Sequence, residues 1–262
     1  MEIHVVIALI CSGLFVGFIN TLSGGATIIS LSVLSWLGLP LSVANGTNRV
    51  AVLFQTLTSV SSFQNNKLID WKKSIKIAIP LVIGSIVGSF IVIKINEEIF
   101  RYCFIVIMAS MVIFMFIKPS LWLKENAELL KKPIKKWYYL LFFLIGIYGG
   151  FIHVGLGYYL LAVIVLGLGH DLLHANAMKN LLVLLYIPFS LIVFIANDQV
   201  VWKYGLIHAI GNVIGAFIAS RLAIKNGNKI IRIVMIFVFL FLIADLTNLI
   251  NVKNFISFLL NK

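Results

Sequence analysis

The six residues Asn20-Thr21-Leu22-Ser23-Gly24-Gly25 separate two apolar runs near the start of the chain, residues 3–19 and 26–38. As a helix, the second run would be only about 20 Å long, because each residue adds about 1.5 Å. The hydrocarbon core of a bilayer is thicker, at roughly 30 Å. The stretch therefore predicts a broken helix, and non-helical backbone at that depth must be buried in protein or line a polar cavity.

A similar interruption occurs in the second half of the chain. Residues 44–101 align with residues 175–232 at a constant offset of 131, so that Asn45 falls on Asn176. Upstream of this alignment, after a two-residue slip, His153-Val154-Gly155-Leu156-Gly157 precedes the apolar run 158–168. Matching breaks in two repeats are typical of secondary transporters, whose substrate sites lie where the repeats meet.

The composition excludes a soluble domain, since 61% of the residues are hydrophobic, 11% are charged and the mean hydropathy is +1.07. We predict an all-α integral membrane protein built from two homologous repeats of inverted topology. Each repeat is a glycine-broken helical hairpin plus three transmembrane helices, about eight membrane segments in all. The predicted parts are a first repeat, a basic cytoplasmic linker, a second repeat and a C-terminal tail: residues 1–118, 119–136, 137–250 and 251–262.

Basic loops predict the orientation, because short loops rich in Lys and Arg face the cytoplasm. The loop with Lys67, Lys72, Lys73 and Lys76 is basic, as are the linker and residues 221–232, whereas residues 94–101 and 198–203 carry balanced charges. Both termini are then external in a multi-pass plasma-membrane protein. This orientation holds if each broken element enters and leaves the membrane on the same side. If each broken element were a single kinked transmembrane span, the two repeats would instead have parallel topology.

The same loops account for the formal net charge of +12. The lysines do not form a basic face interleaved with aromatic residues, so we expect no nucleic-acid partner. The expected partners are the lipid bilayer and a small anionic substrate. No cofactor is expected, and the sequence indicates no particular oligomeric state.

Polar residues follow each break at intervals of three and four, as on one face of a helix. The first stripe runs from Asn45 to Ser62 and includes Gln55, Thr56 and Ser59; the second runs from Asn176 to Ser190 and includes Asn180 and Tyr186. For Ser59, Ser62 and Ser190 we favour hydrogen bonds between helices. The candidate substrate-binding residues are Asn20, Ser23, Gly24, Gly25, Asn45, Thr47, Asn48, Arg49, His153, Gly157, Asn176 and Lys179.

Arg49 and Lys179 leave two interpretations open. They either contact the substrate beside the breaks or anchor their helices by extending to the lipid headgroups. The acidic residues favour an anion as cargo, since Asp245 is the only one inside an apolar run and no pair of carboxylates lies there to relay protons or hold a cation. Short helices beginning near Thr27 and Tyr158 would direct backbone N–H groups toward such an anion, and glycines would let it approach closely.

The run from Gly17 to Thr27, followed by Leu39 to Arg49, resembles the first-repeat signature of the TauE/SafE family of sulfite exporters. In the second half, residues 149–157 and 174–180 resemble the second signature. The likeness covers nearly the whole chain, although Ala26 shortens the glycine run and His153 stands where a small residue is common. It implies a plasma-membrane transporter that exports sulfite, sulfoacetate or related sulfur-containing anions, and not an enzyme.

The alternative is an intramembrane enzyme acting on lipid through His153 or through the pair His170 and His174. Such chemistry needs a partnered carboxylate or nucleophile, and only Asp171 is close in sequence. The spacing of His170 and His174 also suits a metal ion, but no third ligand is evident, so no metal is expected. His208 is interpreted as a hydrogen-bonding group between helices, and the pairs Gly84/Gly88 and Gly211/Gly215 as close helix contacts.

Overall fold

The structure is a computed structural model that describes residues 2–96, 98–100, 102–103 and 126–246. These residues are helical, with no strand among them. Most of the third transmembrane helix predicted for the first repeat, and all of the tail 251–262, lie outside the described residues. The helices are α1 Ile3–Leu22, α2 Thr27–Trp36, α3 Leu41–Asn65, α4 Trp71–Lys94, α6 Ala127–Lys131, α7 Lys136–Phe151, α8 Leu156–Ala162, the π-helical η2 Val163–Gly167, α9 Leu172–Ile195, α10 Trp202–Asn226 and α11 Asn228–Leu246.

Four of the described helices are long and apolar enough to cross a membrane: α1, α4, α9 and α10. Their mean hydropathies lie between 1.5 and 2.3. Helix α3 has 25 residues but is less apolar, because it carries the first polar stripe. The chain is therefore a helical membrane protein, as predicted.

Both predicted helix breaks are present. Four residues, 23–26, separate α1 from α2, and four residues, 152–155, separate α7 from α8. Each break turns through a glycine with positive φ, at +91° for Gly24 and +69° for Gly155, a conformation that side chains with a Cβ rarely adopt. Helix α2 has only 10 residues, so it is too short to cross a bilayer.

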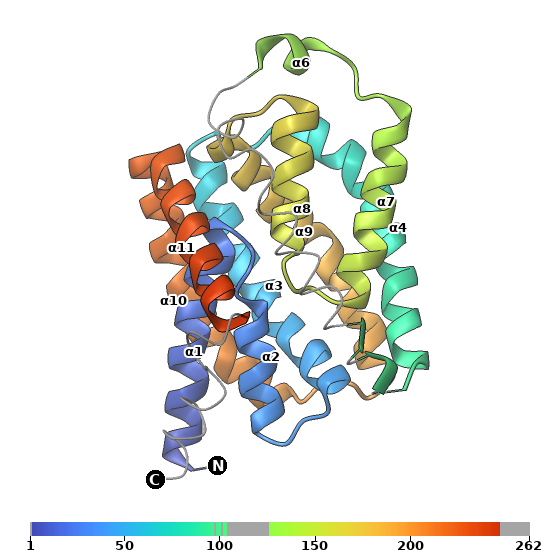
Figure 1. Cartoon of the computed structure of the whole chain (residues 1–262), viewed down its shortest axis with the longest axis vertical. Helices are drawn as coiled ribbons and strands as arrows, with labels where there is room; N and C mark the ends of the chain where they lie inside the picture. The colour runs from blue at the N-terminus through green and yellow to red at the C-terminus, as the bar shows by residue number, and fades with distance from the viewer. Residues whose placement is uncertain (1, 97, 101, 104–125, 247–262) are drawn as a thin grey trace.

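The two broken elements run in opposite directions (Figure 1). Helix α1 starts at the end of the molecule where the N-terminus lies, whereas α7 starts at the opposite end, next to α6. The basic loops gather at the α6 end: Lys73 Nζ donates a hydrogen bond to the Leu130 carbonyl (2.7 Å), and the Leu173 N–H donates one to Asn228 Oδ1 (2.7 Å). The α3–α4 turn, α6, the start of α9 and the α10–α11 turn thus share one end.

Glycines let two helix pairs pack in close contact. Helices α1 and α10 run parallel, and a Cβ on Gly17 would lie 2.3 Å from the Asn212 carbonyl oxygen. Helices α4 and α7 make the equivalent pair, where a Cβ on Gly88 would lie 1.9 Å from the Ile147 carbonyl oxygen. Gly84, Gly211 and Gly215 make similar approaches. The predicted helix contacts are therefore confirmed, and each pair joins helices from different halves of the sequence.

Candidate functional site

The two helix breaks touch each other through glycine. A Cβ on Gly24 would lie 2.5 Å from Gly157 Cα, and a Cβ on Gly157 would lie 2.6 Å from Gly24 Cα. Those distances are shorter than any ordinary carbon contact, so neither position accepts a side chain without a backbone shift. Gly25 is restricted by a side chain instead, because its Cβ would lie 2.5 Å from the Tyr158 hydroxyl. The glycines of the breaks thus bring two segments from opposite halves into backbone contact.

A small cavity of about 10 Å³ lies at this contact. Its walls come from both breaks, from α3 and from α9: Asn20, Gly24, Gln55, Thr56, His153, Gly157, Lys179, Asn180 and Val183. That volume holds about one water molecule. An oxyanion of several heavy atoms therefore fits only if the surrounding elements move apart.

Lys179 is the cation in the wall of this cavity, and its side chain caps the end of α1. Only 2% of the residue is exposed. Its ammonium donates to the Asn20 carbonyl (2.9 Å) and the Thr21 carbonyl (3.1 Å), in the last turn of α1. The last carbonyls of a helix have no partner within the helix and form the negative end of its dipole, so a cation is well placed there.

Arg49 does the same for α7. The residue is fully buried, and its Nη2 donates to the carbonyls of Gly149 (3.1 Å) and Gly150 (2.7 Å), near the end of α7. Its guanidinium also lies over the Phe194 ring, 4.6 Å from the centroid. Nε and Nη1 have no hydrogen-bond partner. Arg49 does not line the cavity.

The interpretation of Arg49 and Lys179 as anchors at the lipid headgroups is wrong, because both are buried inside the protein. Each cation instead caps a broken helix of the other half. None of the ion pairs among the described residues involves either cation. Burying a charge without a counterion is costly, and the helix-end carbonyls that the two cations cap offset part of that cost.

Asn20 bridges the first break. Its Oδ1 accepts a hydrogen bond from the Ala26 N–H (2.8 Å), and its Nδ2 donates to Thr27 Oγ1 (3.0 Å). The expectation that the start of α2 offers free N–H groups is thus corrected in part, since the Ala26 N–H is already used. In the second break, His153 Nδ1 is hydrogen-bonded to the Tyr186 hydroxyl, and the Tyr148 hydroxyl donates to the Val154 carbonyl.

Five of the predicted residues meet at the cavity: Asn20, Gly24, His153, Gly157 and Lys179. The other seven are buried but not in its wall: Ser23, Gly25, Asn45, Thr47, Asn48, Arg49 and Asn176. Thr47 lies near the start of α3, and its Oγ1 accepts a hydrogen bond from the Val201 N–H (2.9 Å) at the start of α10. Asn45 Nδ2 donates to the Phe151 carbonyl (2.8 Å). The Asn48 amide and Asn176 Nδ2 have no partner.

Sequence reasoning left Gln55, Thr56 and Asn180 out of the candidate residues, although they line the cavity. The signal was available, because all three lie on the polar stripes. The helix-contact interpretation is confirmed for Ser59, which donates to Asn180 Oδ1 (3.1 Å), and for Ser190, which bonds Ser89. For Ser62 it is wrong, since Ser62 bonds the Thr58 carbonyl of its own helix (3.2 Å).

His208 also connects helices, as predicted. Its Nδ1 lies 2.9 Å from the Leu9 carbonyl oxygen of α1, and its Nε2 lies 2.8 Å from Ser30 Oγ of α2. The imidazole is fully buried and belongs to α10. It therefore holds the two parts of the first broken element to a helix of the second half.

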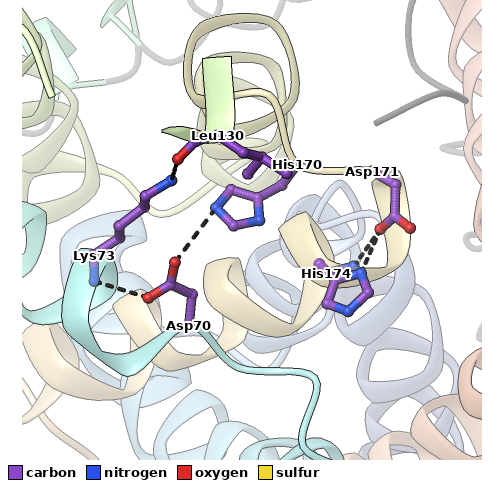
Figure 2. A network of polar contacts seen from close by, with 6 residues as sticks. All are labelled: Asp70, Lys73, Leu130, His170, Asp171 and His174. Carbon is purple, nitrogen blue, oxygen red and sulfur yellow. Dashed lines mark hydrogen bonds and ion pairs between the residues drawn. The ribbon is translucent and has the colours of Figure 1, made fainter. Parts of the chain in front are cut away.

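His170 and His174 point to different partners (Figure 2). His170 Nε2 lies 3.9 Å from Asp70 Oδ2, whereas His174 Nδ1 lies 2.8 Å from Asp171 Oδ1. Burial and the nearby Lys73 lower the pKa of His170 to about 4. Burial would raise the pKa of Asp171, but hydrogen bonds from His174 hold it below its ordinary value. In the described part of the chain, no three metal-binding side chains come together. The cluster includes Lys73, which bonds the Leu130 carbonyl, and therefore lies at the α6 end of the molecule (Figure 2).

The sequence of the chain is similar to a known protein family and to several known proteins. Residues 9–246 match the model of the family described as sulfite exporter TauE/SafE. A "Probable membrane transporter protein" of Haemophilus influenzae is 25% identical over 86% of this chain and 87% of its own length. "Probable membrane transporter protein ORF9" of Sinorhizobium sp is 23% identical over 91% and 90%, and "Probable membrane transporter protein YfcA" of Escherichia coli K12 is 26% identical over 85% and 82%.

No solved structure matches the chain. The family match and the relatives agree with the apolar helices of the fold, and both indicate transport rather than catalysis. The alternative of a lipid-modifying enzyme is therefore set aside. The chain belongs to the sulfite exporter TauE/SafE family and is a membrane transporter, not an enzyme.

Proposed function

We propose that the protein is a secondary transporter that exports small sulfur-containing oxyanions, such as sulfite, thiosulfate or sulfoacetate, across the plasma membrane by alternating access. The observation that carries the proposal is Lys179, a buried cation in the wall of the cavity where two glycine breaks meet. The cavity wall contains no carboxylate among the described residues. The family name supports sulfite as the cargo.

The proposed site comprises the twelve residues named from the sequence together with Gln55, Thr56 and Asn180. Its ammonium, amide and hydroxyl groups donate hydrogen bonds, which are the interactions that an oxyanion requires. The close approach of Gly24 to Gly157 gives the anion access to backbone N–H groups once the segments separate. Asn48 and Arg49 lie outside the cavity wall, but both hold donors without a partner and would extend the site along α3.

The proposed architecture is a pair of inverted repeats, residues 1–118 and 137–250, joined by a cytoplasmic linker at 119–136 and followed by a tail at 251–262. Three features support it. Helices α3 and α9 begin 131 residues apart, as do α4 and α10. Helices α1 and α7 run in opposite directions, and the basic loops lie at one end (Figure 1). With three spans after each broken hairpin, the chain has about eight membrane segments.

Export requires no coupled ion in this scheme. A cell interior is negative, so the outward movement of one negative charge is favoured by about 2.3 kcal/mol for every 100 mV. A proton-coupled or sodium-coupled mechanism usually relies on intramembrane carboxylates. None of the cavity residues is acidic.

Transport into proteoliposomes tests the proposal. The full-length protein is reconstituted, a potential is set with valinomycin and potassium, and the uptake of labelled sulfite, thiosulfate, sulfoacetate, sulfate and acetate is measured. We expect uptake of unaltered sulfur oxyanion that changes with the sign of the potential. Protein-free vesicles are the control, and the lack of uptake of every sulfur anion at either polarity would refute the proposal.

A further inference from the structure

The ammonium of Lys179 is in contact with both a helix end and the cavity. It has three N–H donors, and two are used by the Asn20 and Thr21 carbonyls of α1. Lys179 also lines the cavity together with Asn20. One N–H is therefore left for an anion in the cavity, and any further bond from the ammonium to that anion is made at the expense of the α1 carbonyls.

Arg49 is held more firmly. Its guanidinium bonds two carbonyls of α7 and also lies over the Phe194 ring, 4.6 Å from the centroid. A planar guanidinium that is both hydrogen-bonded and stacked loses more contacts on moving than a flexible ammonium does. Arg49 is also outside the cavity wall. An anion in the cavity thus meets Lys179 and leaves Arg49 in place.

The end of α1 keeps one other partner when the ammonium leaves. Asn180 Nδ2 donates to the Thr21 carbonyl (3.1 Å), whereas the Asn20 carbonyl has Lys179 as its side-chain donor. Removal of the ammonium therefore weakens the last turn of α1 without leaving both carbonyls unpaired. A helix end that loses its cap frays.

Building on the proposed function, we infer that the substrate anion opens the first break by drawing the Lys179 ammonium away from the α1 carbonyls. The charged bond from the ammonium to an oxyanion replaces its bonds to two neutral carbonyls. The end of α1 and the break that follows are then free to move, while Arg49 keeps the end of α7 fixed. Binding of the anion and movement of the first hairpin are one event, so neutral solutes of the same size do not trigger it.

Hydrogen–deuterium exchange of the full-length protein in nanodiscs tests this inference. With sodium sulfite, and with sodium chloride at equal ionic strength as the reference, we expect residues 17–23 to exchange about tenfold faster. Residues 146–152, at the end of α7, should not change. Residues 17–22 of this segment belong to α1 itself, and Ser23 is the only residue of the break that falls within it.

Lys179→Gln is the decisive variant. A glutamine amide has two donors for the α1 carbonyls but no charge to attract an anion. We expect residues 17–23 of this variant to exchange at the same rate with and without sulfite. We also expect its sulfite flux to fall by at least about tenfold. Lys203→Gln removes the same charge from an exposed position on α10 and should respond as the unmodified protein does. Lys179→Arg, which keeps the charge, should retain a sulfite response and shows that the position tolerates substitution.

The outcomes separate the inference from the proposed function. If the unmodified protein transports sulfite but residues 17–23 exchange no faster, the inference is wrong and the transport proposal stands. A sulfite response that persists in Lys179→Gln also refutes it. If no sulfur anion is transported, both the proposed function and the inference are wrong.

Discussion

The two helix breaks have equal length but different chemistry. Residues 23–26 are Ser, Gly, Gly and Ala, whereas residues 152–155 are Ile, His, Val and Gly. The first break is spanned by one side chain, Asn20, and its helix end is held by the flexible ammonium of Lys179. The second is braced by two tyrosines and by a stacked guanidinium, that of Arg49. From this difference we expect the first break to move during transport and the second to stay fixed.

The largest effect should come from the glycine contact itself. Gly24→Val places a β-branched side chain at a φ of +91° and directs its Cβ into Gly157, so we expect sulfite flux below detection and a large fall in melting temperature. Gly38→Val is the matched control, because Gly38 has a φ of +90° and nothing within 4 Å. Gly38→Val should lose only about 1–2 kcal/mol of stability, which is the cost of the backbone strain alone. Equal melting temperatures for the two variants would contradict a steric role for the contact.

The two caps should differ in what their loss affects. Arg49→Ala removes two buried hydrogen bonds and the contact with Phe194, so we expect unfolding to become easier by about 3 kcal/mol. Lys179→Ala removes a smaller group and should lower the stability less than Arg49→Ala does. It should nevertheless reduce the sulfite flux at least as strongly as Arg49→Ala. Denaturant unfolding in detergent, followed by circular dichroism, compares the stabilities. A larger stability loss in Lys179→Ala would reverse the assignment of rigid and mobile breaks.

The tyrosines of the second break allow a smaller test. Tyr186→Phe and Tyr148→Phe each remove one hydrogen-bonded hydroxyl, and each should lower the stability by about 1 kcal/mol. Only Tyr186 bonds His153, which lines the cavity. We therefore expect Tyr186→Phe to change the concentration of sulfite at half-maximal flux, and Tyr148→Phe to leave it near the unmodified value. If both variants transport sulfite identically, the orientation of His153 does not affect transport.

The smallest effect should be a response of the second hairpin to pH. The pKa of His170 is about 4 in the folded protein, because of burial and Lys73, against an ordinary value of 6.5. An opened form takes up a proton at higher pH, so the packed form is most stable above about pH 6.5 and loses stability as the pH falls toward 4. Asp70, Lys73, Asp171 and His174 are the charged or titratable neighbours.

Hydrogen exchange between pH 7.5 and 5 measures this response once the intrinsic pH effect on exchange has been subtracted. Residues 163–171 should become less protected at low pH. The corresponding part of the first hairpin, residues 32–39, carries no titratable side chain and should not respond. His170→Asn should remove the difference, and an unchanged pH response in that variant would assign it to another group.

Much of the fold could be predicted, because polar residues and helix breaks are energetically unfavourable inside a bilayer. Where they occur, they mark a segment that is buried in the protein or interrupted. The interruptions at Gly24 and near Gly155 lie within a few residues of their predicted places. The glycine pairs and His208 were also predicted correctly, since small residues and lone polar groups have few uses inside a bilayer. The span after α4 falls largely outside the described residues.

The candidate site was harder to predict, because its hydrogen bonds join residues far apart in sequence. Arg49 bonds carbonyls 100 and 101 positions away, and Lys179 bonds carbonyls 158 and 159 positions away. The partner atoms are backbone carbonyls. Every residue has one, so the residue type does not show which carbonyl accepts the bond. A polar stripe predicts which face of a helix is buried, but it does not distinguish a residue that caps a neighbouring helix, such as Thr47, from one that lines a cavity.

The glycine-packed pairing of α1 with α10 has a consequence for biosynthesis. Leu9 and His208, which meet across this pair, are 199 positions apart in the chain. Helix α1 is thus synthesised long before α10, the helix that it packs against. Until α10 has been made, the glycine face of α1 contacts lipid or the insertion machinery, so final assembly of the first hairpin waits for α10.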